Sequence, residues 1–323
     1  MLTKRKILIA GLMLSISLGL LIFRPNTLAA TDQAINEFPT SGQPERIITG
    51  PDGNLWFTES GAIGRITTAG VVTEFPLPVG SSDPEGIAAG PDGNIWFTLP
   101  YQGKVDRITP LGSITETSGF DTPWGITPGP DGNMWITEHD HVSQITTTGT
   151  ITTFLIAPES YPEALTLGPD GNLWYVSTVF HRGGTQIGQI TPTGVYTTFP
   201  AGGIADLTAG RDGNIWFSQL WQDKIGRITP AGSITEFDLP PTPDGFCGCP
   251  DGITTGPDSF IWFMSFYAVG RITPDGQVSY FGISGSGPGI TTGPDGSLWY
   301  TDYANQQIGR LIIHRSFLPL VAR

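Results

Sequence analysis

A short apolar run built around tryptophan recurs along the chain, and polar turn residues precede it each time. The stretch GPDGNLWFTESGAIGRITTAGVVTEF, residues 50–75, shows the unit: a turn, a continuous apolar run, and two segments in which apolar and polar residues alternate. The marker tryptophans are Trp56, Trp96, Trp135, Trp174, Trp216, Trp262 and Trp299, with spacings of 40, 39, 39, 42, 46 and 37 residues. Self-similarity with such a period is typical of a repeat architecture.

Each unit predicts four short β-strands. A segment such as GITTG comes first, a Pro-Asp-Gly turn follows, and strands such as LWFTE, IGRIT and ITEF complete the unit. Pro, Asp and Gly suit a type I turn, and a Leu-Trp-Phe run suits a strand that is covered on both faces. We therefore predict an all-β fold, a seven-bladed β-propeller of four-stranded blades over residues 31–311, with residues 312–323 as a C-terminal tail.

The last unit lacks its outer strand. Arg310 is followed by no ITEF segment, whereas INEF stands at residues 35–38, near the other end of the chain. We expect this N-terminal segment to supply the outer strand of the seventh blade and so to close the ring, which removes an exposed sheet edge.

Several units also place a glutamate nine residues after an arginine, as in Arg65 and Glu74. A two-residue hairpin loop would set the two side chains directly opposite each other, which suits opposite charges. A bulged turn, the alternative, would shift the register by one residue.

Residues 1–30 differ from the repeats. Basic residues at 4–6 precede an apolar run over 7–23, and alanines follow at 29–30. This order predicts a secretory leader, with an uncleaved N-terminal membrane anchor as the alternative. Without it the chain holds 12 basic and 29 acidic residues, a net charge of −17, which argues against nucleic acid and anionic membranes as partners. We expect a secreted or extracytoplasmic monomer that meets a membrane only through an uncleaved leader.

Function is expected on the rim opposite the short, uniform Pro-Asp-Gly turns, where the loops vary. Two positions per unit are expected to point near the central channel there. The first begins the innermost strand and holds Glu45, Glu85, Trp124, Glu163, Ala205, Asp251 and Pro288. The second lies three residues after the marker and holds Glu59, Leu99, Glu138, Ser177, Gln219, Ser265 and Asp302. Crowded carboxylates take up protons or recruit a cation, so Glu85, Glu163 and Asp251 are a candidate Mg²⁺ or Ca²⁺ site; acids that simply face water are the alternative.

Aromatic residues that break the repeat gather on the same rim: Tyr101, Trp124, Phe180, Trp221, Tyr267 and Tyr303. None is needed for blade packing, so with the acids they form a candidate platform for a small molecule or a peptide. Ordinary anchoring of loops is the alternative. The candidate ligand-binding residues are Glu45, Glu59, Glu85, Tyr101, Trp124, Glu138, His139, His141, Glu163, Trp221, Asp251, Tyr267 and Asp302.

Two smaller groups carry candidate chemistry. Glu138, His139 and His141 are a candidate metal site or acid–base pair, because the two histidines would share a face of one extended strand; surface histidines without a role are the alternative.

Cys247 and Cys249 flank one glycine. In an exported chain we expect a tight disulfide that stiffens its loop, the alternative being a two-thiolate metal site for which no further ligand is obvious.

The phrases GPDGNLWFTE, IGRITPAGSITEF and PEGIAAGPDGNIWFT resemble the streptogramin B lyase family, also called the virginiamycin B lyase family, over about residues 33–311. The resemblance implies a seven-bladed enzyme that opens the ester of a cyclic depsipeptide antibiotic by elimination, with Mg²⁺ bound. It also implies a catalytic histidine in a Pro-His-Gly/Ala-Ile phrase that starts an inner strand, and a glutamate after a Trp-Phe phrase. None of the seven inner-strand positions is histidine here, and the glutamate position holds Ser265 and Asp302 in the last two units.

Two classes of function follow. The first is an exported propeller that binds a ligand or partner on its acidic, aromatic rim, which the missing histidines favour. The alternative is a metal-assisted carbon–oxygen lyase or lactone-opening enzyme that acts on a cyclic depsipeptide or lactone. Such an enzyme needs a base near neutral pKa, which a carboxylate provides only when burial or crowding raises its pKa. The sequence fixes no cofactor; Mg²⁺ and Ca²⁺ are the candidates.

Overall fold

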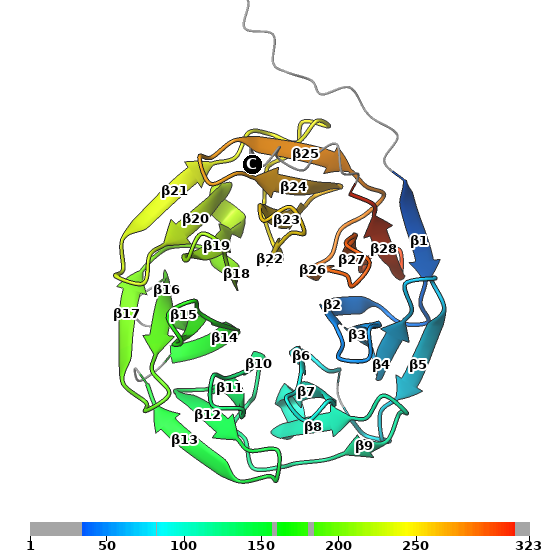
Figure 1. Ribbon diagram of the computed structural model, residues 1–323, viewed down its shortest axis with the longest axis vertical. Helices are drawn as coiled ribbons and strands as arrows, with labels where there is room; N and C mark the ends of the chain where they lie inside the picture. Colours follow the sequence, from blue (N-terminus) through cyan, green and yellow to red (C-terminus); the bar gives the residue numbers. More distant parts are fainter. Residues whose placement is uncertain (1–33, 82, 157–159, 180–183, 314–323) are drawn as a thin grey trace, which may run out of the picture. The chain divides into compact units, whose positions relative to one another are not determined.

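The repeats form a closed ring of seven four-stranded antiparallel sheets (Figure 1). The computed structural model describes residues 34–81, 83–156, 160–179 and 184–313. Each sheet is one blade; blade 1 is β2–β5, and the others follow in chain order. The predicted all-β, seven-bladed propeller is confirmed. The expected leader, residues 1–30, and the tail beyond residue 313 lie outside the described residues.

The innermost strand of each blade lines the channel, and the second strand, which carries the marker tryptophan, packs behind it. The innermost strands are β2 (Pro44–Thr49), β6 (Ile87–Ala89), β10 (Ile126–Pro128), β14 (Ser160–Leu167), β18 (Ile204–Ala209), β22 (Ile253–Thr255) and β26 (Ile290–Thr292). The second strands are β3 (Leu55–Glu59), β7 (Ile95–Leu99), β11 (Met134–Glu138), β15 (Leu173–Val179), β19 (Ile215–Gln219), β23 (Ile261–Ser265) and β27 (Leu298–Asp302). Their continuous apolar runs are buried, as strands between two packed blades require.

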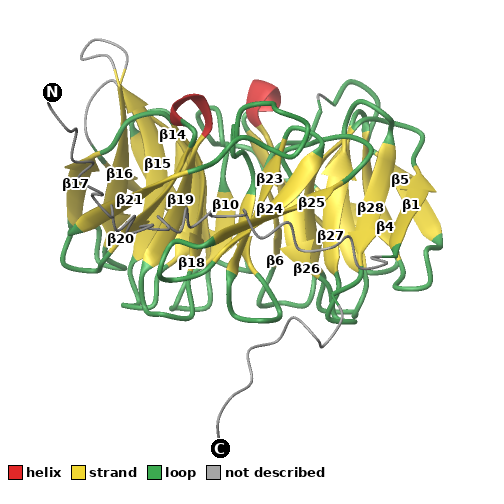
Figure 2. Ribbon diagram, turned by 90° about the horizontal axis from the view of Figure 1, so that it is seen from above, coloured by secondary structure: helices red, strands yellow, loops and turns green. Residues whose placement is uncertain are grey.

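The third and outer strands complete each blade. The third strands are β4 (Ala62–Ile66), β8 (Lys104–Ile108), β12 (His141–Ile145), β16 (Gly184–Ile190), β20 (Lys224–Ile228), β24 (Ala268–Ile272) and β28 (Gln307–Leu311). The outer strands are β5 (Val72–Pro76), β9 (Ile114–Thr115), β13 (Ile151–Leu155), β17 (Tyr196–Pro200), β21 (Ile234–Asp238), β25 (Val278–Gly282) and β1 (Ile35–Pro39). Two short 3-10 helices, η1 (Pro100–Gln102) and η2 (Leu220–Gln222), follow β7 and β19 (Figure 2). We call their side of the ring, which carries the hairpins between second and third strands, the upper rim.

The ring closes through the N-terminal segment. β1 pairs antiparallel with β28, and the sheet order of blade 7 is β1-β28-β27-β26, with Glu37 opposite Gly309. The hydroxyl group of Ser284 also donates a hydrogen bond to the Glu37 carboxylate. This confirms the expected closure: the two ends of the ring share one sheet, so the third strand of blade 7 has an outer neighbour.

The arginine–glutamate pairs are not directly opposed. Arg65 lies opposite Thr73 rather than Glu74, because the turn between the third and outer strands is longer than two residues. The register is thus shifted by one residue, which is the alternative given for a bulged turn, and the prediction of directly opposed Arg and Glu side chains is wrong. Arg65 instead lies over the Trp56 ring, 5.6 Å from its centroid, and donates to the carbonyl oxygen of Pro110 in the next blade at 2.8 Å.

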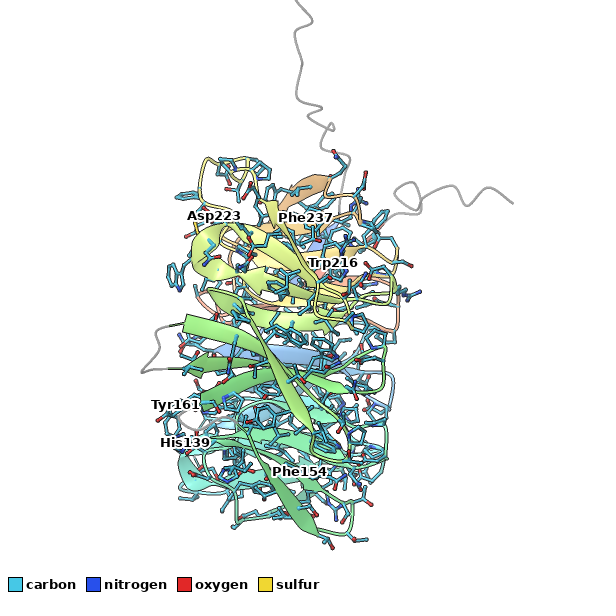
Figure 3. The ribbon with its side chains drawn as sticks, turned by 90° about the vertical axis from the view of Figure 1, so that its left-hand side faces the viewer. His139, Phe154, Tyr161, Trp216, Asp223 and Phe237 are labelled. Carbon is cyan, nitrogen blue, oxygen red and sulfur yellow. A yellow bond between two sulfur atoms is a disulfide. The ribbon has the colours of Figure 1, made fainter. Side chains whose placement is uncertain are left out.

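Each marker tryptophan is buried and tied to the turn before it. The seven side chains are 0–1% exposed, and each indole Nε1–H donates to the carboxylate of the turn aspartate four residues earlier, at 2.9–3.2 Å. In six blades a phenylalanine of the outer strand stacks on the indole, as Phe237 does on Trp216 (Figure 3). In five blades an arginine of the third strand lies over the same ring. The buried indole donors therefore all have acceptors.

We expect Asp92→Ala to lower the free energy of unfolding by about 2 kcal/mol. The substitution leaves the buried Trp96 indole N–H, now bonded at 3.0 Å, without its acceptor and removes the Arg107 ion pair at 3.1 Å. Urea unfolding followed by tryptophan fluorescence measures the change. Asp244→Ala alters an exposed loop and serves as the control; an equal loss in both variants would contradict the assigned role.

Asp106 departs from the repeat in the third strand of blade 2. The equivalent residues of the other blades are Gly64, Ser143, Gly188, Gly226, Gly270 and Gly309. Asp106 is 1% exposed; its Oδ1 accepts a hydrogen bond from the Thr117 N–H at 3.1 Å, and its Oδ2 is buried without a partner among the described residues. Burial raises the pKa of Asp106 to about 6. The folded state therefore disfavours the ionised carboxylate.

This raised pKa predicts a pH-dependent stability. The unfolded pKa of an aspartate is about 4, so the native protein loses stability as pH rises from about 4 through 6, and the full cost remains above that range. Asp106→Asn, which cannot ionise, should be more stable than the unsubstituted protein by about 2 kcal/mol at about pH 7.5 and by almost nothing at about pH 4. Thermal unfolding at both pH values checks this, with Asp275→Asn on an exposed turn as the control. A difference that does not change with pH would refute it.

Candidate functional site

The inner strands enclose a cavity of about 420 Å³ on the channel axis. Glu85 and Trp124 enter its wall just before β6 and β10, Glu163 enters from β14, and Arg46 and Asp206 enter from β2 and β18. Glu85, Trp124 and Glu163 are predicted from the sequence to lie at the channel, and the structure brings them together there. A wall with carboxyl groups, a guanidinium group and an indole ring can bind a ligand by charge and by ring contacts.

Threonine hydroxyl groups of the second strands hold the backbone of this wall. Thr98 Oγ1 accepts a hydrogen bond from the Gly86 N–H at 2.8 Å and donates to the carbonyl oxygen of Trp124 in the next blade at 2.7 Å. Thr137 donates in the same way to the carbonyl oxygen of Glu163 at 2.9 Å. The backbone of Trp124 and of Glu163 is thus held by the blade before it, which places each side chain on a rigid element.

Arg46 and Asp206 were missed by the sequence analysis. They occupy the position that is glycine in four blades, where a Cβ would lie 1.9–2.5 Å from a carbonyl oxygen of the next blade. β2 and β18 accommodate side chains there because each has a β-bulge at this point. The sequence does carry a signal for them. Arg46 and Asp206 have opposite charges at a position that is glycine or alanine in the other blades, and this position directly follows the residue predicted to begin the innermost strand.

The guanidinium group of Arg46 reaches across the channel. Its Nη1 lies 3.4 Å from Asp206 Oδ2, in blade 5, and donates to the carbonyl oxygen of Pro288, in blade 7, at 3.4 Å. Burial raises the pKa values of the carboxyl groups around it, and the positive charge of Arg46 offsets part of each rise. These groups are Glu45, Glu85, Glu163, Asp206 and Asp251. Arg46 is therefore the internal counterion of the acidic ring.

The pKa of Glu85 lies well above the usual range of a glutamate. Burial is the main reason that the pKa of Glu85 rises to about 7, and the neighbouring Glu45 raises it further. The pKa of Glu45 is raised as well, mainly by burial, and each carboxyl group of this pair changes the pKa of the other. The pair therefore titrates as a unit.

The expected divalent-ion set of Glu85, Glu163 and Asp251 is not assembled. Among the described residues, one group of three brings its ligand atoms within 4.8 Å of one another, namely Asp223, Cys247 and Cys249. Asp251 lines a second, smaller cavity of about 70 Å³. Mg²⁺ and Ca²⁺ need several oxygen ligands together, and here Arg46 lies among the channel acids. The donors of the channel therefore do not fit the ion that the family resemblance implies.

The second expected set does not face the channel. These residues end the second strands, except that Ser177 lies two residues before the end of β15, and they are 0–4% exposed: Glu59, Leu99, Glu138, Ser177, Gln219, Ser265 and Asp302. Glu59 accepts a hydrogen bond from the Gly42 N–H at 3.1 Å, Glu138 accepts one from the Asp121 N–H, and Asp302 accepts one from Asn305. None of the seven lines the channel cavity, so the expectation that they point into it is wrong; the side chains of Glu59, Glu138, Gln219 and Ser265 bond the connection that covers them instead.

His139 and His141 do not share a strand face. β11 ends at Glu138 and β12 begins at His141, so His139 and Asp140 form the hairpin turn, with Asp140 at a φ of 58°. The His139 ring packs against Tyr161, with centroids 4.5 Å apart, on the upper rim (Figure 3). His141 Nδ1 bonds the carbonyl oxygen of His139 at 2.7 Å. The prediction that the two histidines share a strand face is therefore wrong. The side chains of Glu138, His139 and His141 do not converge on one metal position.

The exposed aromatic residues lie around the upper rim. Tyr101 on η1 is 75% exposed and Trp221 on η2 is 81% exposed. Tyr101 meets Trp124 edge to face at 6.4 Å, so it extends the aromatic wall of the cavity outwards. Tyr267, further round the ring, packs against Phe246 at 5.9 Å. Phe180 lies outside the described residues. The structure therefore joins one rim aromatic directly to the cavity.

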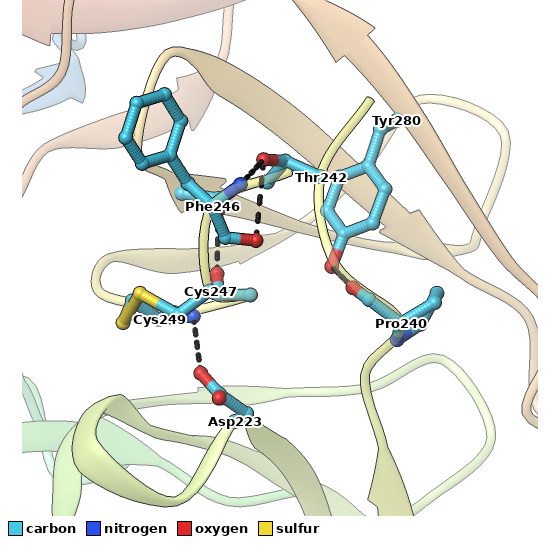
Figure 4. The surroundings of a disulfide bond; sticks show 9 residues. Asp223, Pro240, Thr242, Phe246, Cys247, Cys249 and Tyr280 are labelled. Atoms are coloured by element: carbon cyan, nitrogen blue, oxygen red, sulfur yellow. Dashed lines mark hydrogen bonds between the residues drawn. A yellow bond between two sulfur atoms is a disulfide. The ribbon is translucent and has the colours of Figure 1, made fainter. Parts of the chain in front are cut away.

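A disulfide joins Cys247 and Cys249 in the connection between blades 5 and 6 (Figure 4). The backbone N–H of Cys249 donates to Asp223 Oδ1 at 2.8 Å. Cys249 also lines the second cavity, together with Asp251 and the exposed Phe266. Within the part of the chain that the structure describes, no helix has the length and apolar character needed to span a bilayer.

Comparison with known proteins gives the family. The model of the virginiamycin B lyase family matches residues 27–201 and 118–317. A streptogramin B lyase structure is 32% identical, with a TM-score of 0.78 over 87% of this chain and 98% of that chain. A catalytically inactive histidine-to-alanine variant of virginiamycin B lyase from Staphylococcus aureus, solved with quinupristin, is 31% identical, with a TM-score of 0.78 over 88% and 100%.

More distant similarity extends to the fold alone. Hydrazine synthase from Kuenenia stuttgartiensis is 16% identical, with a TM-score of 0.74 over 91% of this chain and 99% of that chain. No curated protein matches the chain. The matched segments together span nearly all of the ring, and the identities above 30% extend over most of both chains. On this ground the chain belongs to the virginiamycin B lyase family.

Proposed function

We propose that the protein binds a small-molecule or peptide ligand at the upper-rim opening of the central cavity. One observation carries the proposal: a cavity of about 420 Å³ combines the carboxyl groups of Glu85 and Glu163 with the ring of Trp124. Tyr101 continues the aromatic surface towards solvent. Concave sites that combine a few polar groups with apolar rings are the usual form of ligand sites in proteins.

The charge of the wall favours a ligand with a cationic group. Arg46 is one positive charge among five carboxyl groups whose pKa values burial raises. A second cation would therefore favour their ionised forms. An ammonium or guanidinium group beside Trp124 would gain from charge-assisted hydrogen bonds and from the face of the indole ring.

The proposal includes export. The leader-like segment at residues 1–30 and the net charge of −17 without it support a soluble protein outside the cytoplasm. The disulfide between Cys247 and Cys249 supports the same location, since such bonds persist in oxidising compartments. A ring whose ends close on each other supports a monomer.

A second candidate function is a carbon–oxygen lyase, which one observation favours. Elimination needs a base near neutral pKa, and Glu85 has a pKa of about 7 in the cavity wall. Against it, the Staphylococcus aureus relative is described as catalytically inactive once a histidine becomes alanine, and the inner-strand positions of this chain hold no histidine. The family membership gives the fold, and binding alone accounts for the wall as it stands.

Binding is tested with a panel of cyclic peptides that carry one free amine, each paired with its acetylated form. We expect the amine form to quench tryptophan fluorescence and to bind about tenfold more tightly than the neutral form, because acetylation removes a charge-assisted hydrogen bond. Glu163→Gln should reduce that ratio towards one, and Asp275→Asn on the opposite rim should not. Equal affinity for both members of every pair, or a ratio that Glu163→Gln leaves unchanged, would refute the proposal.

Catalysis is tested by incubating the mature protein with quinupristin and Mg²⁺, followed by chromatography and mass measurement. Elimination changes the retention time without changing the mass, whereas hydrolysis adds one water. We expect no conversion at high protein concentration, because the base that the family uses is missing. Conversion that is lost in Glu85→Gln would replace the binding function by the second candidate.

The internal counterion gives a further prediction. Replacement of Arg46 by methionine leaves five carboxyl groups without a cation, so the variant should be less stable and should gain several degrees in melting temperature from millimolar Ca²⁺. The unsubstituted protein and Arg46→Lys should gain far less. Thermal unfolding with and without Ca²⁺ measures the effect. An equal Ca²⁺ response in all three proteins would show that Arg46 does not occupy the cation position.

A further inference from the structure

The disulfide between Cys247 and Cys249 links two positions of one short loop. The two residues are two apart in sequence, in the connection from β21 to β22, so the bond joins no two blades. The entropic gain from a disulfide grows with the logarithm of the loop it closes, and a loop of this size stands at the low end of that scale. Cross-linking of the fold therefore does not account for the pair.

A carboxylate stands against the two sulfur atoms. A ligand oxygen of Asp223 and the two Sγ atoms all lie within 4.8 Å of one another. Cys249 is buried, whereas Asp223 and Cys247 are half-buried, so solvent species reach one side of the group. Asp223 Oδ1 accepts the Cys249 N–H at 2.8 Å, and a carboxylate has two oxygens, so it can keep this bond and still ligate a cation (Figure 4).

The loop is held in place by contacts that do not use the sulfur atoms. Ser265 Oγ donates to the carbonyl oxygen of Gly248 at 2.5 Å, and the Tyr280 hydroxyl group donates to the carbonyl oxygen of Pro240 at 3.0 Å. The Phe246 N–H donates to Thr242 Oγ1 at 3.2 Å. These bonds persist when the sulfur–sulfur bond is broken, so the two thiols and the carboxylate stay close together.

We propose that the reduced pair and Asp223 form a redox-gated site for one Zn²⁺ ion. A dithiol reductant transfers two electrons and two protons: the Sγ–Sγ bond breaks, two thiols form, and the reductant becomes a disulfide. Zinc binding then releases both thiol protons, and two thiolates and one carboxylate oxygen ligate the ion, with water in the fourth position. The disulfide excludes the ion because neither sulfur is then a thiolate.

The equivalent turn in blade 3 offers a control that separates the proposed metal-binding role of Asp223 from its backbone hydrogen bond. Asp140 stands at the equivalent hairpin position, with a φ of 58° against 53° for Asp223. Its Oδ1 accepts the N–H of Ser160 at 2.8 Å, as Asp223 accepts the N–H of Cys249. Both aspartates therefore fasten a connection, but only in blade 5 does the connection bring two sulfur atoms to the carboxylate. Asp140→Asn is accordingly a matched control.

The test uses the whole mature protein and Co²⁺ as a spectroscopic substitute for Zn²⁺. The protein is reduced with a phosphine, freed of reductant without oxygen, and titrated with Co²⁺. We expect thiolate-to-cobalt absorption that saturates at about one equivalent, disappears when Zn²⁺ is added, and is absent from the oxidised protein. Asp223→Asn should weaken Co²⁺ binding by about tenfold or more, whereas Asp140→Asn should not change it.

Two results would overturn the inference. If the reduced protein shows no thiolate-to-cobalt absorption, the site does not exist. If Asp223→Asn binds Co²⁺ as tightly as the unsubstituted protein, the carboxylate is not part of the site. Circular dichroism of each reduced variant confirms that the ring is folded. As a second measurement, Zn²⁺ should slow the reaction of both thiols with an aromatic disulfide reagent in the unsubstituted protein; no protection would also count against the site. The inference does not depend on the proposed ligand function.

Discussion

The hydrogen bond from each marker tryptophan to its turn aspartate is the interaction on which the ring depends. A buried indole N–H needs an acceptor, and the aspartate of the preceding turn supplies it four residues earlier in all seven blades. At Asp52, burial would raise the pKa, but hydrogen bonds from Asn54 and Trp56 outweigh it, so the pKa lies below its usual value. The aspartate is thus ionised at neutral pH, and one residue fixes both the turn and the core.

The same cluster joins the blades to one another. Arginines over the tryptophan rings donate to a carbonyl oxygen in the turn of the next blade, as Arg107 does to Thr147 at 2.7 Å and Arg310 to Thr68 at 3.2 Å. The second of these bonds connects blade 7 to blade 1, so it adds to the closure made by β1 and β28. In a rigid ring of this kind, the shape and charge of the channel depend on the residues at the inner-strand positions.

The fold could be predicted because its signals are local and repeated seven times, whereas the site depends on contacts between blades. The closing strand was visible because INEF repeats ITEF. The site was predicted in part: Glu85, Trp124 and Glu163 do reach the cavity. Arg46 and Asp206 were missed because only the next blade's carbonyl oxygen explains why glycine is the rule there. Glu59 was misplaced because the connection that covers it comes from outside its own repeat.

In the proposed function the wall of the cavity binds a cationic group, and Arg46 already supplies one positive charge to its carboxyl groups from within the chain. Burial would make each carboxylate costly if it stayed charged and alone, so Arg46 lies among them, and the pKa values of Glu45 and Glu85 are raised. The raised pKa of Glu85 arises mainly from burial and then from the neighbouring Glu45, so it follows from the packing of the wall and does not by itself identify a general base. A cationic ligand would supply positive charge at the same place and favour the ionised carboxylates. The absence of histidine from the inner-strand positions and the place of Arg46 among the carboxyl groups both support the proposed binding function over proton abstraction.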